Sequence, residues 1–358
     1  MDQGSHAAIR RAEVVLPGAP LDATLRFFTD ALGFRVDAVF PADDPRQVVI
    51  SGHGLRLRLD RDLDPRPSTL RLECRDDLDG RAREPIVAPN ATVVEFGLAE
   101  APLEVPEHAT RLEHTRAALD GARWVEGRAG MLYRDLIPSR CGGRFIASHI
   151  RIPEGGPVPD YVHYHRVAFQ MIYCRRGWVR VVYEDQGPPF VLEAGDCVLQ
   201  PPQIRHRVLE CSDGLEVIEL GCPALHETLV DHALTLPTQE LRPERTFGGQ
   251  LFTRHRASEA SWEPWTTPGF AARDLGIQRA SRRAAAHVLR LRPEGGDAAL
   301  TFPDAFSFAF VLRGSLSWST SANERLVLAE GDAATFPAGQ TLPGLEVSPD
   351  LELLLVRE

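Results

Sequence analysis

Short runs of β-branched and aromatic residues, separated by turn signals, fill the chain after about residue 120. Such residues favour strands over helices, and 29 Gly and 28 Pro residues punctuate the sequence. The clearest runs are Phe169–Cys174, Trp178–Tyr183, Phe190–Leu192, Leu215–Leu220, His287–Leu291, Phe306–Leu312 and Leu351–Val356. The pattern predicts a mainly β architecture for this part of the chain.

The first 65 residues have a different pattern. Ala12–Leu16 reads as a strand, and Pro20–Leu32 carries apolar residues at helical spacing before Gly33 ends the run. Three further strand-like runs follow, at Phe34–Phe40, Gln47–Ile50 and Leu55–Leu59. Residues 1–65 are therefore predicted to form a small α+β module of the order βαβββ.

Residues 66–120 give a weaker signal. They contain Pro85, Pro89, Pro102 and Pro106, and a single clear strand pattern at Thr92–Phe96. We interpret them as a connector of uncertain structure.

The β-rich part repeats itself weakly. Ile152–Gly156 is echoed by Leu291–Gly296, Gly177 by Gly314, and the six-residue step from Gly195 to Pro201 by that from Gly331 to Pro337. Two similar barrels in tandem, at residues 121–240 and 241–358, explain these echoes.

Charge and composition narrow the class of protein. The net charge of −10 argues against a nucleic-acid surface, which needs concentrated Lys and Arg. No apolar run approaches the roughly 20 residues that span a bilayer, and Met1–Ser5 has neither the charge nor the apolar core of a secretion signal. The expectation is a cytoplasmic protein whose partner is a small molecule, with no membrane and no nucleic acid.

One group of polar residues carries the candidate chemistry. His163 and His165 are two residues apart on a predicted strand, so both side chains point to the same face. Gln170 projects from the next strand, and His206 follows a strand–turn–strand pattern that begins at Gly195. The spacing predicts a metal site inside a barrel, with these four side chains as ligands; Gln170 binds either directly or through a water molecule.

These residues resemble the two sequence motifs of the cupin superfamily. The first motif is matched by Gly156, His163, His165, Gln170 and Gly177, with Gln in place of the usual Glu. The second is matched in spacing by Gly195, Pro201, Gln203, His206 and Glu210, with Gln203 replacing Gly and Glu210 replacing Asn. The resemblance implies double-stranded β-helix (jelly-roll) barrels.

The second repeat keeps the turn residues and loses the ligands. Thr301 and Pro303 stand at the two histidine positions, Ser307 at the Glu position and Leu342 at the last His. The chain thus resembles bicupins that retain one metal site, and barrel 2 is expected to be metal-free. Cupins often pair through sheet faces, so the resemblance also implies a homodimer.

The amino-terminal module resembles the vicinal oxygen chelate superfamily, the glyoxalase and bleomycin-resistance group. Leu25–Val36 and Gly52–Leu59 carry this resemblance, and Glu13 falls near the position of a first ligand. The alternative to a second catalytic site is a dimerisation or lid domain.

Glutamine instead of glutamate changes the electrostatics of the predicted site, because an amide cancels none of the charge of the ion. Such a centre favours an anionic substrate that binds through two oxygens. Imidazole donors suit Fe(II), and also Zn, Mn, Ni or Cu; Fe(II) is preferred because cupin dioxygenases with three histidines share this neutral set. One divalent transition metal per chain is expected.

Other polar residues near the motifs are candidates for the pocket. Tyr133 and Glu210 are predicted as catalytic residues, with Glu210 facing inward if its strand continues without a bulge. Arg134, His149, Arg151 and Tyr183 are predicted to bind substrate, since guanidinium groups hold carboxylates bidentately. Surface ion pairs and wall packing are the alternatives for these residues.

The resulting prediction is a metal-dependent cupin enzyme that acts on a small oxygen-rich organic acid or phenol, a dioxygenase in the leading hypothesis. The alternatives are a non-redox isomerase, lyase or hydrolase of the cupin type and a non-catalytic, metal-dependent binding protein.

Overall fold

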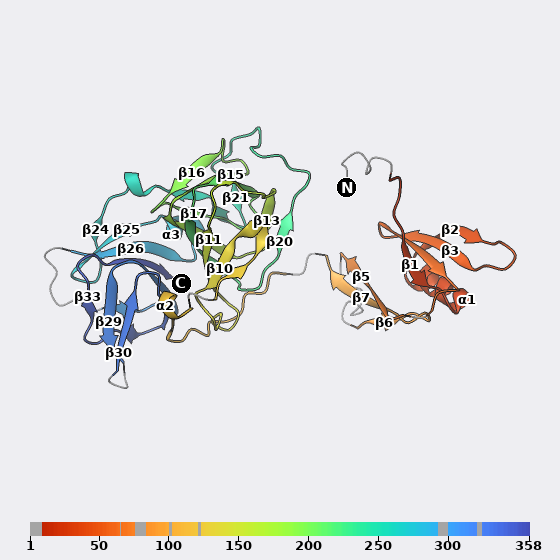
Figure 1. Cartoon of the computed structure of the whole chain (residues 1–358), viewed down its shortest axis with the longest axis horizontal. Coiled ribbons are helices and arrows are strands. Elements are labelled where there is room, and N and C mark those ends of the chain that lie inside the picture. Colours follow the sequence, from red (N-terminus) through yellow and green to blue (C-terminus); the bar gives the residue numbers. More distant parts are fainter. Residues whose placement is uncertain are drawn as a thin grey trace. The chain divides into compact units, whose positions relative to one another are not determined.

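A computed structural model describes residues 9–64, 66–75, 84–99, 102–120, 123–292, 300–320 and 324–358. The chain divides into two compact units, Met1–Pro102 and Leu103–Glu358. Strands dominate both units (Figure 1), which confirms the predicted mainly β class. None of the helices in the described part is long and apolar enough to cross a membrane.

The first unit begins with a four-stranded sheet. Its strands are β1 (Val14–Pro17), β2 (Arg35–Phe40), β3 (Gln47–Gly52) and β4 (Leu55–Asp60), in the order β1-β4-β3-β2 with β1 parallel to β4. Helix α1 (Leu21–Arg26) continues as a π-helical turn over Phe27–Ala31. Its apolar face packs on the sheet because Leu21 and Phe28 are buried with Ile50 and Leu57.

A second, three-stranded sheet follows in the segment where the sequence predicted a connector. Strand β5 (Ser68–Cys74) lies parallel to β7 (Thr92–Leu98), and β6 (Ile86–Val87) pairs with the other edge of β7. Val94 is buried in the same core as the first sheet, and Leu70 and Leu72 pack against it. The sequence analysis missed β5, whose Leu residues alternate with charged ones as in a half-buried strand.

The first half of the larger unit is built from two sheets that face each other. The seven-stranded sheet has the order β23-β17-β14-β19-β11-β10-β9, and the six-stranded assembly has the order β16-β15-β18-β13-β20, with β12 also paired to β18. Helix-like turns are short here, at Arg128–Gly130 and Ala257–Glu259. The strands are β9 (Val125–Glu126), β10 (Leu132–Asp135), β11 (Ile146–Ile152), β12 (Gly156–Pro157), β13 (His163–His165), β14 (Phe169–Arg176), β15 (Trp178–Tyr183), β16 (Phe190–Glu193), β17 (Cys197–Leu199), β18 (His206–Cys211), β19 (Leu215–Cys222), β20 (Thr228–Val230) and β23 (Thr253–His255).

The second half has a similar arrangement but a filled interior. A seven-stranded sheet has the order β24-β25-β26-β34-β28-β31-β8, and smaller sheets pair β30-β29-β33 and β27-β32. Phe302, Trp318, Phe336 and Leu342 are buried in one hydrophobic cluster between the sheets. The elements are β8 (Glu113–Thr115), α2 (Ala117–Asp120), β21 (Thr246–Phe247), β22 (Gln250–Leu251), β24 (Glu263–Pro264), β25 (Phe270–Asp274), α3 (Ile277–Ser281), β26 (Ala285–Leu291), β27 (Thr301–Phe302), β28 (Phe306–Arg313), β29 (Ser315–Ser319), β30 (Arg325–Ala329), β31 (Ala333–Pro337), β32 (Gln340–Thr341), β33 (Glu346–Val347) and β34 (Glu352–Arg357).

The two halves exchange strands. Strand β8 precedes the first half in sequence but pairs with β31 of the second half, and β23 follows the first half and pairs with its strand β17. The halves also share one buried core, in which Phe145 stacks on Phe306 at 3.8 Å between ring centroids. The sequence-based boundaries at residues 120 and 240 do not describe this exchange. Residues 293–296 of the predicted repeat lie outside the described residues.

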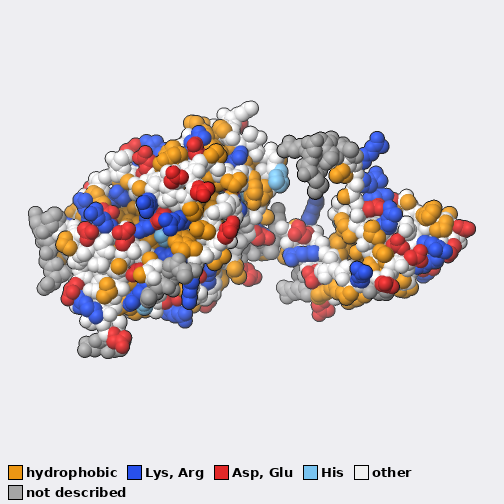
Figure 2. All heavy atoms as spheres, viewed as in Figure 1, with side chains coloured by type: hydrophobic (Ala, Val, Ile, Leu, Met, Phe, Trp, Pro, Cys, Tyr) orange, Lys and Arg blue, Asp and Glu red, His pale blue; other side chains and the backbone are white. Residues whose placement is uncertain are grey.

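Charged side chains of both signs are interspersed over the face of the larger unit seen in Figure 2. Many of them form ion pairs, such as that between Arg144 and Glu358 at 2.9 Å. On this face the two signs of charge are mixed, as expected for a chain whose net charge of −10 is a small difference between many acidic and many basic residues.

Candidate metal centre

A cavity of about 460 Å³ lies between the two facing sheets of the first half. Its wall consists of alternate residues of each strand, as the two-residue period of a strand requires. Apolar side chains make up most of the lining: Met131, Ile146, Ile150, Ile152, Ile172, Val179, Val181, Leu192, Val208, Leu215 and Val217. The polar groups that interrupt this surface therefore stand out as candidates for chemistry.

Three histidines meet at one point of the wall. His163 and His165 come from β13, and His206, the first residue of β18, lies directly opposite His163 in the antiparallel register. One ring nitrogen of each of the three lies within 4.8 Å of those of the other two. The tertiary structure thus brings together the three histidines that the sequence predicted as ligands.

Hydrogen bonds orient two of the three rings. The Nδ1–H of His163 donates to the carbonyl oxygen of Tyr161 at 2.9 Å, and that of His206 donates to the carbonyl oxygen of Ile204 at 3.0 Å. Because a carbonyl only accepts, Nδ1 carries the proton in both rings and Nε2 keeps a free electron pair. The Nδ1 of His165 lies 2.9 Å from the hydroxyl of Thr228. Such second contacts are typical of metal-binding histidines.

Burial keeps these imidazoles neutral. Desolvation lowers the pKa of all three, and for His165 the neighbouring His163, His226 and Arg128 add to the effect and bring the pKa to about 3. Neutral imidazoles are the form that binds metals, so no proton has to leave at pH 7. A divalent transition metal therefore fits the donor set.

Arg128 lies beside the cluster. Its Nη2 donates to Nε2 of His163 at 3.0 Å, the atom that would face an ion, and its Nη1 forms an ion pair with Asp160. Asp160 is buried and also accepts a hydrogen bond from the backbone N–H of Val208 at 2.9 Å. The guanidinium is thereby held at the edge of the candidate metal position. Arg128 is not among the residues predicted from the sequence.

Gln170 lines the same cavity, and both ends of its amide are engaged. Its Nε2 donates to Oε1 of Glu219 at 2.6 Å, and its Oε1 accepts from Nε2 of Gln200 at 3.0 Å. One lone pair of Oε1 thus accepts the hydrogen bond from Gln200, and the second lone pair would be the one to bind an ion directly.

The two predicted tyrosines also line the cavity. The hydroxyl of Tyr183 donates to Oε1 of Gln200 at 2.6 Å, and its ring stacks on His206 with centroids 5.4 Å apart. Burial raises the pKa of the Tyr133 hydroxyl, and the negative charge of Glu219 raises it further by a smaller amount. A protonated hydroxyl is thus present on the wall at neutral pH, in agreement with the predicted position of Tyr133.

Glu210 points away from the cavity, contrary to the prediction. The pairing between β15 and β18 shifts register between Arg180 and Val181, so Leu209 is an extra residue on β18. This bulge reverses the alternation that starts at His206. The carboxylate of Glu210 instead forms an ion pair with Arg180 at 3.1 Å and is 38% exposed.

The predicted substrate-binding residues Arg134, His149 and Arg151 lie on the other face of their strands. On β11 the residues that line the cavity are those with even numbers, from Ile146 to Ile152. His149 is therefore turned outward, where its Nε2 lies 2.9 Å from Glu216. Arg134 is buried and donates to the carbonyl oxygen of Gly331 in the second half at 2.5 Å. Arg134 and His149, which also packs edge-on against Phe310, thus join the two halves, while Arg151 lies near Glu216 at the surface; none of the three lines the cavity.

Five further polar residues on the cavity wall were not predicted, and Ser148 of β11 is one of them. Gln200 and Glu219 come from the seven-stranded side, and His226 and Thr228 come from the segment that follows β19. Period-two alternation along Leu215–Cys222 places Glu219 on the face of Leu215 and Val217. That signal was available, but nothing in the sequence shows which face of the strand is the interior.

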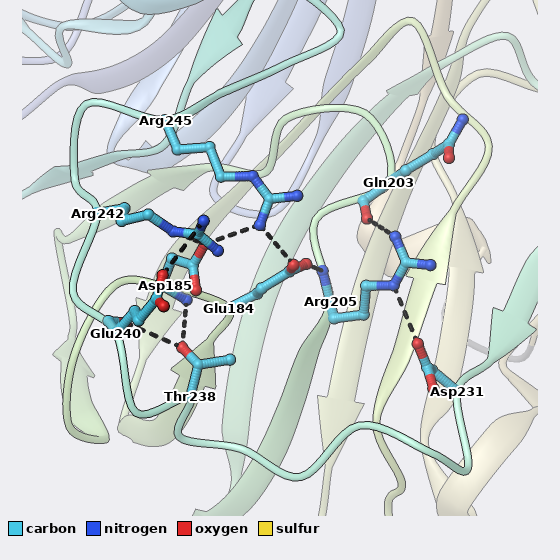
Figure 3. Close-up of polar contacts among 9 residues, drawn as sticks. All are labelled: Glu184, Asp185, Gln203, Arg205, Asp231, Thr238, Glu240, Arg242 and Arg245. Carbon is cyan, nitrogen blue, oxygen red and sulfur yellow. Dashed lines mark hydrogen bonds and ion pairs between the residues drawn. The ribbon is translucent and has the colours of Figure 1, made fainter.

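The segment that carries His226 and Thr228 is tied to the barrel by ion pairs (Figure 3). Asp231 accepts from Arg205 at 3.2 Å. Farther along, Arg242 and Arg245 bind the buried carboxylate of Asp185 at 2.6 and 2.7 Å, and the hydroxyl of Thr238 accepts from the Asp185 backbone N–H. These contacts anchor the segment after β20, and the pairing of β20 with β13 places Thr228 next to His165.

The positions that depart from the cupin motifs can also be located in the structure. Gln203 has φ of 62°, the left-handed conformation that Gly adopts without strain. In the second half, Ser307 and Leu342 are buried and Thr301 is exposed. The described residues that hold three potential ligands together are His163, His165 and His206, and they lie in the first half.

Comparison with known proteins agrees with this geometry. Residues 148–218 match the family model of a cupin domain. Among curated proteins, no match to the sequence was found. The solved structures to which the fold is similar include a salicylate 1,2-dioxygenase from Pseudaminobacter salicylatoxidans, with 14% identity, a TM-score of 0.51, and coverage of 71% of this chain and 85% of that one.

Two other solved structures are similar at lower scores. Protein Ylba from E. coli has 12% identity and a TM-score of 0.48, with coverage of 78% of this chain and 95% of that chain. Oxalate decarboxylase from Bacillus subtilis has 13% identity and a TM-score of 0.44, with 63% and 72% covered. The chain therefore contains a cupin domain, with a buried cluster of three histidines on its inner wall.

Proposed function

We propose that this protein is a metal-dependent cupin enzyme that acts on a small oxygen-rich organic acid or phenol, with dioxygenation as the leading reaction. The observation that carries the proposal is the set of three neutral imidazoles, each with Nδ1 in a hydrogen bond, at the wall of an apolar cavity. His163, His165 and His206 would hold one divalent transition metal, Fe(II) in the leading hypothesis.

When bound, the ion would supply Lewis acidity and, if it is iron, redox chemistry. The residues of the chain supply the rest. Arg128 has a donor at the atom of His163 that would hold the ion, so in the metal-loaded protein this donor would be available to a substrate anion. Tyr133 offers a protonated hydroxyl, and the apolar wall accommodates a hydrocarbon or aromatic body while it excludes water.

The first test is the ion. We expect purified protein to contain about one transition metal per chain, and His163→Ala to lose it with at least a 100-fold weaker affinity, because two imidazoles alone hold an ion poorly. His232→Ala is the control, since that histidine is exposed on the linker. Elemental analysis and competition with a chelator measure both, and full metal retention in His163→Ala would refute the assignment.

The second test is the reaction. Oxygen consumption in proportion to the loss of salicylate-, gentisate- or catechol-type substrates would support the dioxygenase, because the similar solved structure is a salicylate 1,2-dioxygenase. Turnover under strict anaerobic conditions would instead support a non-redox isomerase, lyase or hydrolase. The cavity favours this alternative through a carboxylate and a tyrosine, Glu219 and Tyr133, that could move protons without dioxygen. Binding without turnover would leave a metal-dependent binding protein.

For the rest of the chain we propose two tandem barrels, the second without metal, and a homodimer as in other cupins. The interior of the second barrel is filled by buried aromatic and aliphatic residues, which supports a packing role for that barrel.

We further propose a glyoxalase-like module at the amino terminus. The strand order β1-β4-β3-β2 supports it, and β5-β7-β6 repeats the parallel and antiparallel pairings of β1-β4-β3. Glu13 forms ion pairs with Arg56 and Arg58, which favours a lid or dimerisation role over a second metal site.

A further inference from the structure

The cavity has two walls of different chemistry. The three histidines belong to the six-stranded assembly, through β13 and β18. Gln170 and Glu219 belong to β14 and β19 of the seven-stranded sheet that faces it. In the register of that sheet Glu219 lies between Ser148 and Ile172, which both line the cavity. A molecule bound between the walls would meet the histidines on one side and Glu219 on the other.

A directed chain of hydrogen bonds holds Glu219 in place. The hydroxyl of Tyr183 donates to Gln200, Gln200 donates to Gln170, and Gln170 donates to Oε1 of Glu219, at 2.6, 3.0 and 2.6 Å. An ionised carboxylate only accepts, so Glu219 sets the direction of both amides. Tyr183, Gln200 and Gln170 are almost fully buried, at 2%, 5% and 1% exposure, which makes the chain a rigid support.

The two glutamates of β19 have opposite surroundings. Glu216 lies on the outer face, where its carboxylate binds His149 and Arg175. Glu219 is half-buried on the cavity face, and none of the ion pairs among the described residues includes it. In the described part of the chain its Oε1 accepts from Gln170, and Oε2 has no hydrogen-bond partner. A carboxylate without a cationic partner in an apolar cavity is costly, and a bound ligand would offset that cost.

From this arrangement we infer that Glu219 is a specificity-determining residue: it selects substrates that present a hydroxyl or amino donor to the wall opposite the metal, and Gln170 is the residue that positions it. The inference rests on the proposed function. It narrows the substrate class to acids with an apolar body and a hydrogen-bond donor. The inference also explains why Gln170 stands where the cupin motif usually has Glu: an amide at this position can donate a hydrogen bond to Glu219, and a carboxylate cannot.

The experiment uses the full chain loaded with Zn²⁺, which binds ligands without redox turnover. Calorimetry would measure the affinity of two matched pairs, 2-hydroxybenzoate against benzoate and mandelate against phenylacetate. We expect the wild type to prefer the hydroxylated member of at least one pair. Glu219→Gln should reduce that preference about tenfold or more, because a charge-assisted hydrogen bond is lost, with the zinc content and the affinity for the other member unchanged.

Glu210→Gln is the matched control. It removes the same charge from the same barrel, but its side chain points outward, so the preference should be kept. Gln170→Met keeps the charge of Glu219 and removes the side chain that donates a hydrogen bond to it. A reduced preference with unchanged zinc content would support the positioning role of Gln170. This variant also tests the inference if Glu219→Gln does not fold.

Each other result contradicts the inference. A wild type that binds none of the acids or shows no preference would overturn it, as would a preference that persists in both Glu219→Gln and Gln170→Met, since the ion itself would then recognise the hydroxyl. Loss of zinc in Glu219→Gln would make Glu219 a ligand and not a selector. Failure of the proposed function is a different result: a wild type that takes up no zinc, or a His163→Ala variant that keeps it.

Discussion

At the scale of single residues, Gln170 decides the electrostatics of the cavity. An amide at this position donates to Glu219 and leaves one negative charge on the wall that faces three neutral imidazoles. A carboxylate there would place two negative charges in contact. The substitution that follows from the cupin motif, Gln170→Glu, therefore tests the site directly.

We expect Gln170→Glu to destabilise the metal-free protein by about 1–3 kcal/mol, because two carboxylates repel each other where an amide formed a hydrogen bond. A divalent cation would relieve the repulsion. Zn²⁺ should therefore raise the melting temperature of Gln170→Glu more than that of the wild type, as measured by thermal unfolding with and without the metal. Equal increments in the two proteins would contradict this account of position 170.

At the scale of elements, the segment after β19 completes the site. Strand β20 pairs with β13 so that Thr228 lies opposite His165, and the hydroxyl of Thr228 reaches the Nδ1 of that histidine. The segment is anchored at a distance, where Arg242 and Arg245 bind Asp185 (Figure 3). A segment that follows the last long strand of the first half thus becomes part of the cavity wall.

Asp185→Asn should loosen this segment. Asp185 is buried, while its partners Arg242 and Arg245 are 52% and 36% exposed, so we expect a modest loss of about 1–2 kcal/mol in the free energy of unfolding. Limited proteolysis should cut residues 231–245 sooner, and metal should dissociate faster. Glu240→Gln is the control, because that carboxylate is 70% exposed. Identical cleavage patterns in the two variants would argue against the anchoring role.

At the scale of the whole molecule, the larger unit folds as one body because its halves share a core and exchange strands. Phe145 of the first half stacks on Phe306 of the second, and Arg175 joins Glu216 to Glu330 across the halves. The three-histidine cluster therefore depends on packing in a half that supplies none of its residues.

Phe306→Ala tests this dependence. Removal of a fully buried ring should cost about 3–5 kcal/mol, and the three-histidine site should be lost in the same unfolding transition as the second half. Fluorescence of Trp318, in a background where the other four tryptophans are replaced by Phe, and metal release, followed in one denaturant titration, would report the two halves. Two separate midpoints would show that the halves unfold independently.

The acid stability of the larger unit should depend on Glu216. Burial raises the pKa of this carboxyl, but hydrogen bonds and charges from His149 and Arg175 outweigh it and bring the pKa to about 2. A depressed pKa stabilises the fold above the unfolded value of about 4.5, and the contribution is lost as the pH falls toward 2. Glu216→Gln should therefore cost about 1–2 kcal/mol at pH 7 and progressively less between pH 4.5 and 2, measured by denaturation at each pH.

Several features of this protein could be predicted from the sequence because they depend on local patterns. The strand runs, the same-face position of His163 and His165, and the match of His206 to a turn motif all follow from alternation with period two and from turn residues. The histidine cluster could be predicted for this reason. Strand β5 follows the same rule, since Leu70 and Leu72 alternate with Arg71 and Glu73, but the charged residues mask its apolar face.

What only the tertiary structure decided was which face of each strand lies inside. The bulge at Leu209 turned Glu210 outward, and the phases of β10 and β11 turned Arg134, His149 and Arg151 away from the cavity. The register of β19 placed Glu219 in the cavity, and the turn of Arg128 and the segment of His226, which are not strands, complete the wall. Local sequence determines the alternation of a strand, but its phase relative to the core depends on contacts between residues far apart in the chain.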